Sequence, residues 1–276
     1  MLIDTHAHLN FSAYKDDAEE VIKKTLEKGV FMINVGSQYS TSVRAVEFAK
    51  KYETGVWAAV GIHPLHLERR NFNYKDDNEL EEIEIKTNGE EFNYENYLVL
   101  AKNPKVVAIG EMGLDYHHFE EGDDVEELKT KQKEILLQGI KLANAVKKPI
   151  IIHCWDAYDD LLEILKNNEL EKKGVIHSFV GGYKTAKKFI ELGYKIGLNG
   201  VVTYGISYNR LIREIDLRDI VLETDCPYLT PVPKKGERNE PLNVRYVAEK
   251  IAEVKNIKLE EVEKITTQNA KKLFGI

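Results

Sequence analysis

The chain has 276 residues, of which 31% are charged and 9% aromatic, and a formal net charge of −7. This composition is typical of a globular protein, and the acidic balance excludes a general electrostatic grip on nucleic acid or an anionic membrane. Bound divalent metals could still attract a phosphate-bearing substrate. Two cysteines, Cys154 and Cys226, provide no disulfide framework. Because there is no signal-like N-terminal segment and no membrane-length apolar run, we expect a cytoplasmic protein.

Short aliphatic runs alternate along the chain with amphipathic, Lys/Glu-rich segments. Eight runs are predicted strands, at residues 2–5, 30–35, 56–60, 106–110, 149–153, 174–177, 194–198 and 220–224. Several are apolar throughout, which is typical of parallel strands covered on both faces. Helical patterns occur between them, at 17–28, 40–52, 126–146, 157–167, 185–192 and 209–215. This alternation predicts an α/β fold, a (β/α)8 TIM-like barrel formed by residues 1–276 as a single domain.

The segment 68–97 interrupts this alternation between the third and fourth predicted strands. It is rich in Asn, Glu, Lys and Tyr and has few aliphatic residues. We expect a solvated insertion that contains a helix. The alternative is a lid over the active face, because the βα loops of a barrel open there.

Histidines and acids recur where the predicted strands end. His6 and His8 end the first strand, and side chains two residues apart on an extended chain point to the same face, so both can reach one ion. The remaining groups at strand ends are Glu111, His153, His177 and Asp225. In a barrel, the carboxyl ends of the strands converge on one mouth, where active sites lie.

Imidazole and carboxylate ligands suit Zn, Mn, Fe or Ni, and ligand type does not choose among these metals. The predicted mouth offers one carboxylate more than a single tetrahedral ion needs. Two ions sharing Glu111 is therefore the economical arrangement. The sequence predicts two divalent metal ions and leaves their identity open among Mg, Mn, Zn, Ni and Fe.

Several strings of residues resemble a known family. They are Asp-Thr-His-Ala-His-Leu (4–9), Val-Gly-Ile-His-Pro-Leu-His (60–66), Gly-Glu-Met-Gly-Leu-Asp-Tyr (110–116), Ile-Ile-His-Cys-Trp-Asp-Ala (151–157), His-Ser-Phe-Val-Gly-Gly (177–182), Glu-Thr-Asp-Cys-Pro-Tyr-Leu (223–229) and Arg-Asn-Glu-Pro (238–241). In this order they resemble the TatD family of metal-dependent hydrolases, within the amidohydrolase superfamily. The resemblance extends from Asp4 to the Asn-Ala-x-x-Leu-Phe ending, interrupted mainly by the insertion.

The resemblance implies a role for each residue at the predicted mouth. His6, His8 and Asp225 match the ligands of a first metal. Glu111 matches the carboxylate that bridges both metals, and the second metal's histidines match His153 and His177. The resemblance further implies that Asp225 is the general base that accepts a proton from an activated water.

Residues outside this set are candidates for substrate contacts. His63 and His66 resemble family positions that contact substrate phosphate, and the alternative is that they order their loop. Asp156 could orient a ligand histidine or contact substrate. Arg238 and Glu240, in a loop after the last strand, could hold substrate or support the barrel mouth.

One residue departs from the family pattern. The family usually has Arg where this chain has Trp155, so a cation that could reach a phosphate is lost. The indole could instead stack on a base, or it could simply pack against a neighbouring loop. Among nearby residues, we expect His117 and His118 to be exposed in a loop, and Cys154 and Cys226 to be small buried packing residues.

Two enzymatic functions and one non-enzymatic function are compatible with these residues. The first is hydrolysis of a phosphodiester, as in a deoxyribonuclease, with DNA as partner; the absence of a basic stripe favours binding the end of a single strand through few contacts. The second is hydrolysis of an ester or amide, for example an aminoacyl ester, at the same site. A charged phosphate pocket around His63, His66 and Arg238 would favour the first, and an apolar pocket the second. The third, a non-catalytic nucleic-acid-binding protein, leaves the complete set of metal-competent residues unexplained.

Overall fold

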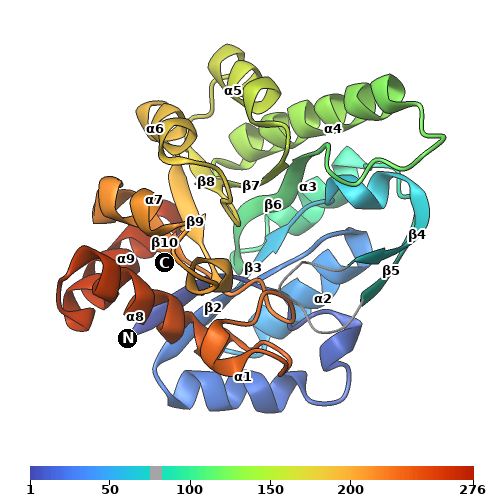
Figure 1. The fold of residues 1–276 in the computed structure, drawn as a ribbon. Helices are drawn as coiled ribbons and strands as arrows, with labels where there is room; N and C mark the ends of the chain where they lie inside the picture. The colour runs from blue at the N-terminus through green and yellow to red at the C-terminus, as the bar shows by residue number, and fades with distance from the viewer. Residues whose placement is uncertain (75–82) are drawn as a thin grey trace.

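The computed structural model describes residues 1–74 and 83–276, and its centre is a sheet of eight parallel strands (Figure 1). Their order in the sheet is β1-β2-β3-β6-β7-β8-β9-β10. The strands are β1 (Leu2–Ala7), β2 (Val30–Val35), β3 (Val56–Val60), β6 (Val106–Asp115), β7 (Ile150–Trp155), β8 (Gly174–Ile176), β9 (Lys195–Leu198) and β10 (Ile220–Leu222). A parallel bridge between Ala7 and Cys226 joins the two ends of the sheet. The expected (β/α)8 barrel is confirmed.

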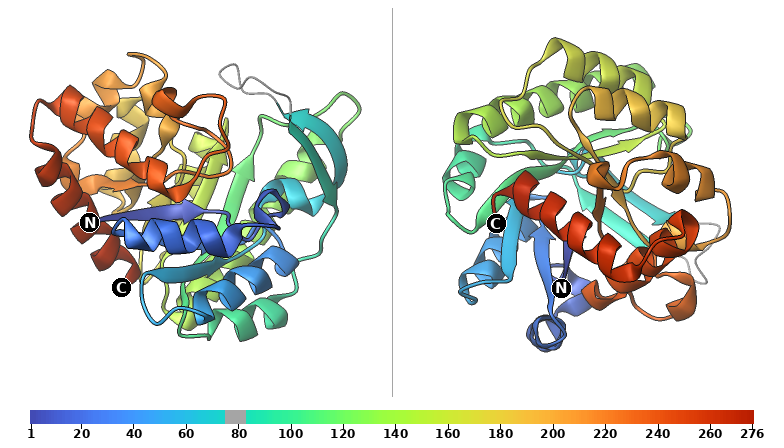
Figure 2. Two further views of the ribbon diagram at one scale, coloured as in Figure 1. Left: turned by 90° about the horizontal axis from the view of Figure 1, so that it is seen from below. Right: turned by 90° about the vertical axis from the view of Figure 1, so that its left-hand side faces the viewer.

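Helices surround the strands (Figures 1 and 2). They are α1 (Ala18–Glu27), α2 (Tyr39–Lys50), α3 (Tyr94–Ala101), α4 (Val125–Val146), α5 (Tyr158–Asn167), α6 (Tyr183–Glu191), α7 (Asn209–Glu214), α8 (Val244–Lys255) and α9 (Leu259–Phe274). Several begin at a side chain that satisfies a free backbone amide, as at Asp124, which accepts a hydrogen bond from the amide of Glu127. The predicted helices are all present within a few residues; α8 and α9 lie beyond the last one predicted.

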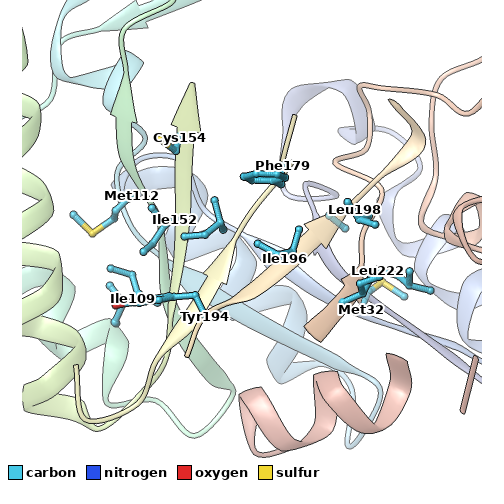
Figure 3. Close-up of a cluster of buried hydrophobic side chains, with 14 of the residues drawn as sticks. Met32, Ile109, Met112, Ile152, Cys154, Phe179, Tyr194, Ile196, Leu198 and Leu222 are labelled. Carbon is cyan, nitrogen blue, oxygen red and sulfur yellow. The ribbon is translucent and has the colours of Figure 1, made fainter. Parts of the chain in front are cut away.

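Both faces of the strands are buried. On the outer face, Met112, Ile152 and Leu198 (Figure 3) belong to a large cluster that also contains helix side chains such as Leu136 of α4. The inner face holds a second, smaller cluster, to which Ile151 and Phe274 of α9 belong. The two clusters explain why the strands read as continuous apolar runs in the sequence.

Two strand irregularities turn functional side chains into the barrel. Ile3 faces the inner cluster, so regular alternation would place His6 on the opposite face, but the register of β1 against β2 shifts between Asp4 and Ala7. The register of β6 against β7 shifts in the same way between Ile109 and Met112, around Glu111. Such bulges re-aim a side chain and occur frequently next to active sites.

The seam between β1 and the end of β10 is held by the buried carboxylate of Asp4. Its two oxygens accept hydrogen bonds from the backbone amide of Thr224 at 2.9 Å and from the Thr224 hydroxyl at 2.6 Å. The amide of Asp225 donates to the carbonyl of His6 at 2.9 Å. Closure of the barrel therefore brings the end of β10 directly beside the histidine pair of β1.

The insertion differs from its prediction. A two-stranded antiparallel hairpin, β4 (Arg69–Tyr74) and β5 (Ile83–Asn88), precedes the helix α3, which begins only at Tyr94. In the sequence, Ile83 and Ile85 alternate with Glu84 and Lys86, a strand pattern that the polar composition obscured. The part of the insertion at 75–82 lies outside the described residues, so the lid remains an expectation.

In the parts of the chain that the structure describes, no helix combines the length and the apolar character needed to cross a membrane.

We expect the side chain of Phe274 to contribute strongly to stability. It is 5% exposed and packs in the inner cluster. Phe274→Ala should lower the free energy of unfolding by about 3–5 kcal/mol because it removes a buried ring and leaves a cavity. Denaturant unfolding measures the change. Val99→Ala, at a side chain that is 71% exposed, is the control and should change stability by less than about 0.5 kcal/mol; equal effects of the two substitutions would contradict the assignment.

Candidate metal centre

The histidine pair of β1 lies at the centre of the barrel mouth. His6 and His8 are buried, and their Nε2 atoms are 3.1 Å apart. The Nδ1 of His8 lies 2.8 Å from the carbonyl oxygen of Val35. Because a carbonyl oxygen only accepts, Nδ1 carries the proton, and in the neutral ring Nε2 presents its lone pair toward His6. This is the tautomer that a metal-binding imidazole requires.

The carboxylate of Glu111 lies between two groups of histidines. Its Oε2 atom is 3.3 Å from Nε2 of His6 and 3.9 Å from Nε2 of His8. Its Oε1 atom is 3.1 Å from Nδ1 of His153 and 3.5 Å from Nε2 of His63. Each oxygen therefore faces its own set of nitrogen donors, which is the arrangement of a carboxylate that bridges two ions.

His153 reaches this centre from β7 and is oriented by Asp115, at the end of β6. Its Nε2 atom lies 2.9 Å from Oδ2 of Asp115, which leaves Nδ1 pointing at Glu111. The same carboxylate accepts a hydrogen bond from Nδ1 of His118. Burial would raise the pKa of Asp115, but the hydrogen bonds from His118 and His153 outweigh it and hold that pKa below its ordinary value. Asp115 therefore remains an anion.

His177 and Asp225 complete the cluster. The Nε2 atom of His177 lies 3.6 Å from Glu111 and 3.7 Å from Oδ1 of Asp225, while its Nδ1 lies 3.1 Å from the buried carboxylate of Glu223. Gly197 makes room for Glu223: a Cβ atom at residue 197 would lie 2.5 Å from its Oε2. Asp225, at φ 60°, places Oδ1 3.2 Å from Nε2 of His8.

These donors fit a divalent metal centre. Among the described residues, three groups have ligand atoms within 4.8 Å of one another: His6, His8 and Glu111; His63, Glu111 and His153; and His6, His177 and Asp225. The predicted ligands thus come together at one place. His63, expected to contact phosphate, lies among them, and His177 groups with His6 and Asp225 rather than with His153. The mixture of imidazole and carboxylate suits Zn, Mn, Fe or Ni.

Of the residues predicted to contact substrate, His66, Arg238 and Glu240 lie outside the three donor groups. Burial lowers the pKa of His66 to about 4, so its ring is neutral at pH 7. Arg238 donates to both oxygens of Asp17 at 3.0 and 2.5 Å, and its guanidinium lies 4.2 Å from the centre of the Tyr14 ring. Glu240 forms an ion pair with Lys24 at 3.1 Å. These contacts of Arg238 and Glu240 tie their loop to α1 and its preceding turn, as expected of residues that support the mouth.

One of the two alternatives for Asp156, and the expectation for His118, were wrong; a substrate contact by Asp156 stays a prediction. Asp156 does not orient a ligand histidine: its carboxylate lies 2.8 Å from Nδ1 of His117, and Asp115 orients His153 instead. His118 is not an exposed loop residue, because its side chain is 14% exposed and is anchored to Asp115.

The other neighbouring side chains lie as expected. His117 is exposed, and Cys154 and Cys226 are buried free thiols.

Sequence reasoning assigned no role to the buried acids Asp115 and Glu223, although both lie in the quoted strings. Glu223 precedes Asp225 by two residues, and that spacing at a strand end could have indicated that both point into the mouth. A comparable signal existed for Asp115, which follows Glu111 by four residues on β6: pairing with β7 is regular from Met112 to Asp115, and an even spacing places both acids on one face.

Comparisons with known proteins agree with the family resemblance found in the sequence. Residues 3–275 match the family model described as TatD related DNase. The uncharacterised metal-dependent hydrolase YabD of Bacillus subtilis is 39% identical over the full length of both chains. Its counterpart YcfH of Escherichia coli is 31% identical and matches over all of this chain and 96% of its own. The crystal structure of YjjV, a TatD homologue of Escherichia coli, superposes with a TM-score of 0.83 at 28% identity, covering 100% of this chain and 98% of that one.

Metal binding should release protons. Burial would lower the pKa values of His153 and His177, but the facing carboxylates outweigh it and raise them to about 9 and about 10. Without metal, both rings are therefore protonated at pH 7. Each ring must lose a proton before its nitrogen can bind a metal ion. Affinity for Zn²⁺ should rise with pH up to about these values. Calorimetric titration at pH 7 in two buffers of different ionisation enthalpy measures the release; equal heats in both buffers would contradict it.

Loss of the histidine pair should remove metal. We expect His6→Ala combined with His8→Ala to lose roughly half of the bound divalent ion, because one of two sites loses its nitrogen ligands. Metal analysis of the purified protein measures this. His117→Ala, an exposed histidine outside the donor groups, is the control and should retain its metal. Full occupancy in the double variant would show that the pair is not a ligand set.

Proposed function

Because the chain belongs to the TatD family of metal-dependent hydrolases, we propose that it cleaves a phosphodiester bond at the end of a single DNA strand. The observation that carries the proposal is the position of Glu111, whose two oxygens face separate sets of imidazole nitrogens. A carboxylate in that position suits two ions held close together. Paired divalent ions would lower the pKa of a water nucleophile and stabilise the attacking and leaving oxygens of an in-line displacement.

The chain's own residues then have distinct roles. In the proposal, His6, His8 and Asp225 hold one ion, His153 and His177 hold the other, and Glu111 holds both. Although His177 also lies close to His6 and Asp225, its Nε2 atom faces the same oxygen of Glu111, Oε1, as His153 does. Asp115 and Glu223 keep the rings of His153 and His177 turned toward the centre.

Asp225 is the residue best placed to accept a proton. Its side chain is 17% exposed, whereas those of His6, His8, Glu111 and His177 are at most 5% exposed. Burial would raise its pKa, but the charge of His177 and the hydrogen bond with His8 outweigh burial and lower it. Asp225 is therefore an anion that faces the open side of the cluster, as a general base must be.

The charge on a phosphate would be met mainly by the metals. Arg238 is paired with Asp17, and burial lowers the pKa of both His63 and His66, so these rings are neutral. These three residues therefore offer a phosphate little free positive charge, which favours a second candidate, hydrolysis of an uncharged ester or amide by the same groups. An aminoacyl ester is one such substrate.

A substrate panel distinguishes the two candidates. With Mg²⁺, Mn²⁺ or Zn²⁺ bound, we expect cleavage of single-stranded DNA in preference to double-stranded DNA, since a chain with a net charge of −7 and no basic stripe in its sequence is poorly suited to hold a duplex. RNA, aryl phosphodiesters, aryl esters and aryl amides complete the panel. Cleavage of esters or amides without any phosphodiesterase activity would establish the second candidate in place of the first.

Replacement of the proposed base should abolish turnover. Asp225→Asn keeps the size of the side chain but removes the proton acceptor, so kcat should fall by about 100-fold or more. Thermal unfolding and metal analysis of the same variant report whether fold and metal are retained. Asp159→Asn, at a 98% exposed carboxylate, is the matched control and should keep its kcat; an active Asp225→Asn enzyme would rule out the role.

A further inference from the structure

Trp155 lies directly above a candidate metal ligand. It is the last residue of β7, two residues beyond His153. Side chains two apart on a strand point to the same face and are separated by roughly 6.5–7 Å along it. The intervening Cys154 packs on the outer face of the barrel (Figure 3). The indole therefore lies on the same side as His153, one step further toward the mouth.

His117 forms a parallel stack with this indole. The ring centres of His117 and Trp155 are 4.3 Å apart and the planes differ by 10°. Nδ1 of His117 lies 2.8 Å from the carboxylate of Asp156, which fixes the ring from its edge. Nevertheless, the His117 side chain is 47% exposed. A flat ring is thus held in one orientation while much of its surface faces solvent.

The stack is connected to the metal centre through His118. The ring of His118 meets the indole edge-on, with centres 5.1 Å apart and an interplanar angle of 88°. Its Nδ1 is bound by Asp115, the carboxylate that also orients His153. The carboxylate of Asp115 therefore positions both His153, a candidate ligand, and His118, which supports the stack. This shared anchor fixes the distance between the candidate metal centre and the stack.

An exposed and pre-oriented ring beside a hydrolytic centre is suited to a planar ligand. Stacking on an aromatic side chain tolerates any base, because every base has a π-face. It also needs no positive charge, which matters in a chain whose net charge is −7. A ring already fixed by its neighbours loses little entropy when a ligand stacks on it.

We propose that Trp155 and His117 form a stacking platform, and that the open face of His117 binds the nucleobase adjoining the phosphate at the metal centre. The platform selects substrates with a base at that position and is indifferent to which base it is. This inference rests on the proposed phosphodiesterase function for its substrate class. Its binding preference is measurable without turnover.

The test compares two ligands that differ only by a base: thymidine 5′-monophosphate and 1,2-dideoxyribose 5-phosphate, which has hydrogen in place of the base. Calorimetry with the Mn²⁺-loaded chain should give tighter binding of the nucleotide by about 5- to 150-fold, the range expected for one stacked base. His117→Ala and Trp155→Ala should bring that ratio close to one, and His117→Phe should preserve most of it. Trp57→Phe, at the other tryptophan, which packs against Phe31, is the control and should leave the ratio unchanged.

Equal binding of both ligands by the wild-type chain, binding of neither, or an unchanged ratio in His117→Ala would overturn the platform. Cleavage of single-stranded DNA is assayed separately. A preference for the nucleotide in a chain that cleaves no DNA would leave the platform standing and refute the proposed function. If DNA is cleaved, Trp155→Ala should raise KM on an oligonucleotide with little change in kcat, and should not alter KM for an oligonucleotide that lacks the base at that position.

Discussion

The buried carboxylate of Glu111 is an anion with almost no access to water, and such a charge is costly unless cations or hydrogen-bond donors surround it. Here imidazole nitrogens from several strands surround both of its oxygens. Burial would raise the pKa of Glu111, but electrostatic attraction to the rings of His63, His6 and His177 together with the hydrogen bond from His153 outweighs burial and holds that pKa well below its ordinary value. The barrel mouth is therefore stable only when these rings converge, and the strands must close in the register that brings them together.

The convergence of the histidine rings on Glu111 depends on three further buried acids, each of which positions a different part of the barrel. Asp4 joins the ends of the closed sheet, Asp115 turns His153, and Glu223 turns His177. None of them belongs to the candidate donor groups. Their spatial arrangement helps to explain why a cluster of histidines can be both buried and oriented: in His153, His177 and His8, the ring nitrogen directed away from the centre faces a carboxylate or a carbonyl.

The barrel could be predicted because strand and helix periodicities survive in single sequences, and the donors could be predicted because polar residues at the ends of apolar strands are conspicuous. Prediction failed where a contact joins segments distant in sequence. Nothing near Arg238 indicates that Asp17, 221 residues away, neutralises it. Asp156 adjoins a ligand strand but pairs with His117, and the hairpin β4–β5 was obscured because polar residues dominate its segment. The number and identity of the metals depend on coordination that residue types do not specify.

The register shift in β1 makes the direction of two side chains depend on one backbone irregularity. A strand has a two-residue repeat, and the shift absorbs one extra residue between Asp4 and Ala7, so a β1 of the same length that paired regularly with β2 would turn every later side chain to the opposite face. Both histidines would then turn away from the mouth although neither had been altered. Over evolutionary time, β1 and the equivalent stretch of β6 should lose the shift only together with one residue, because a regular strand one residue shorter presents the same faces.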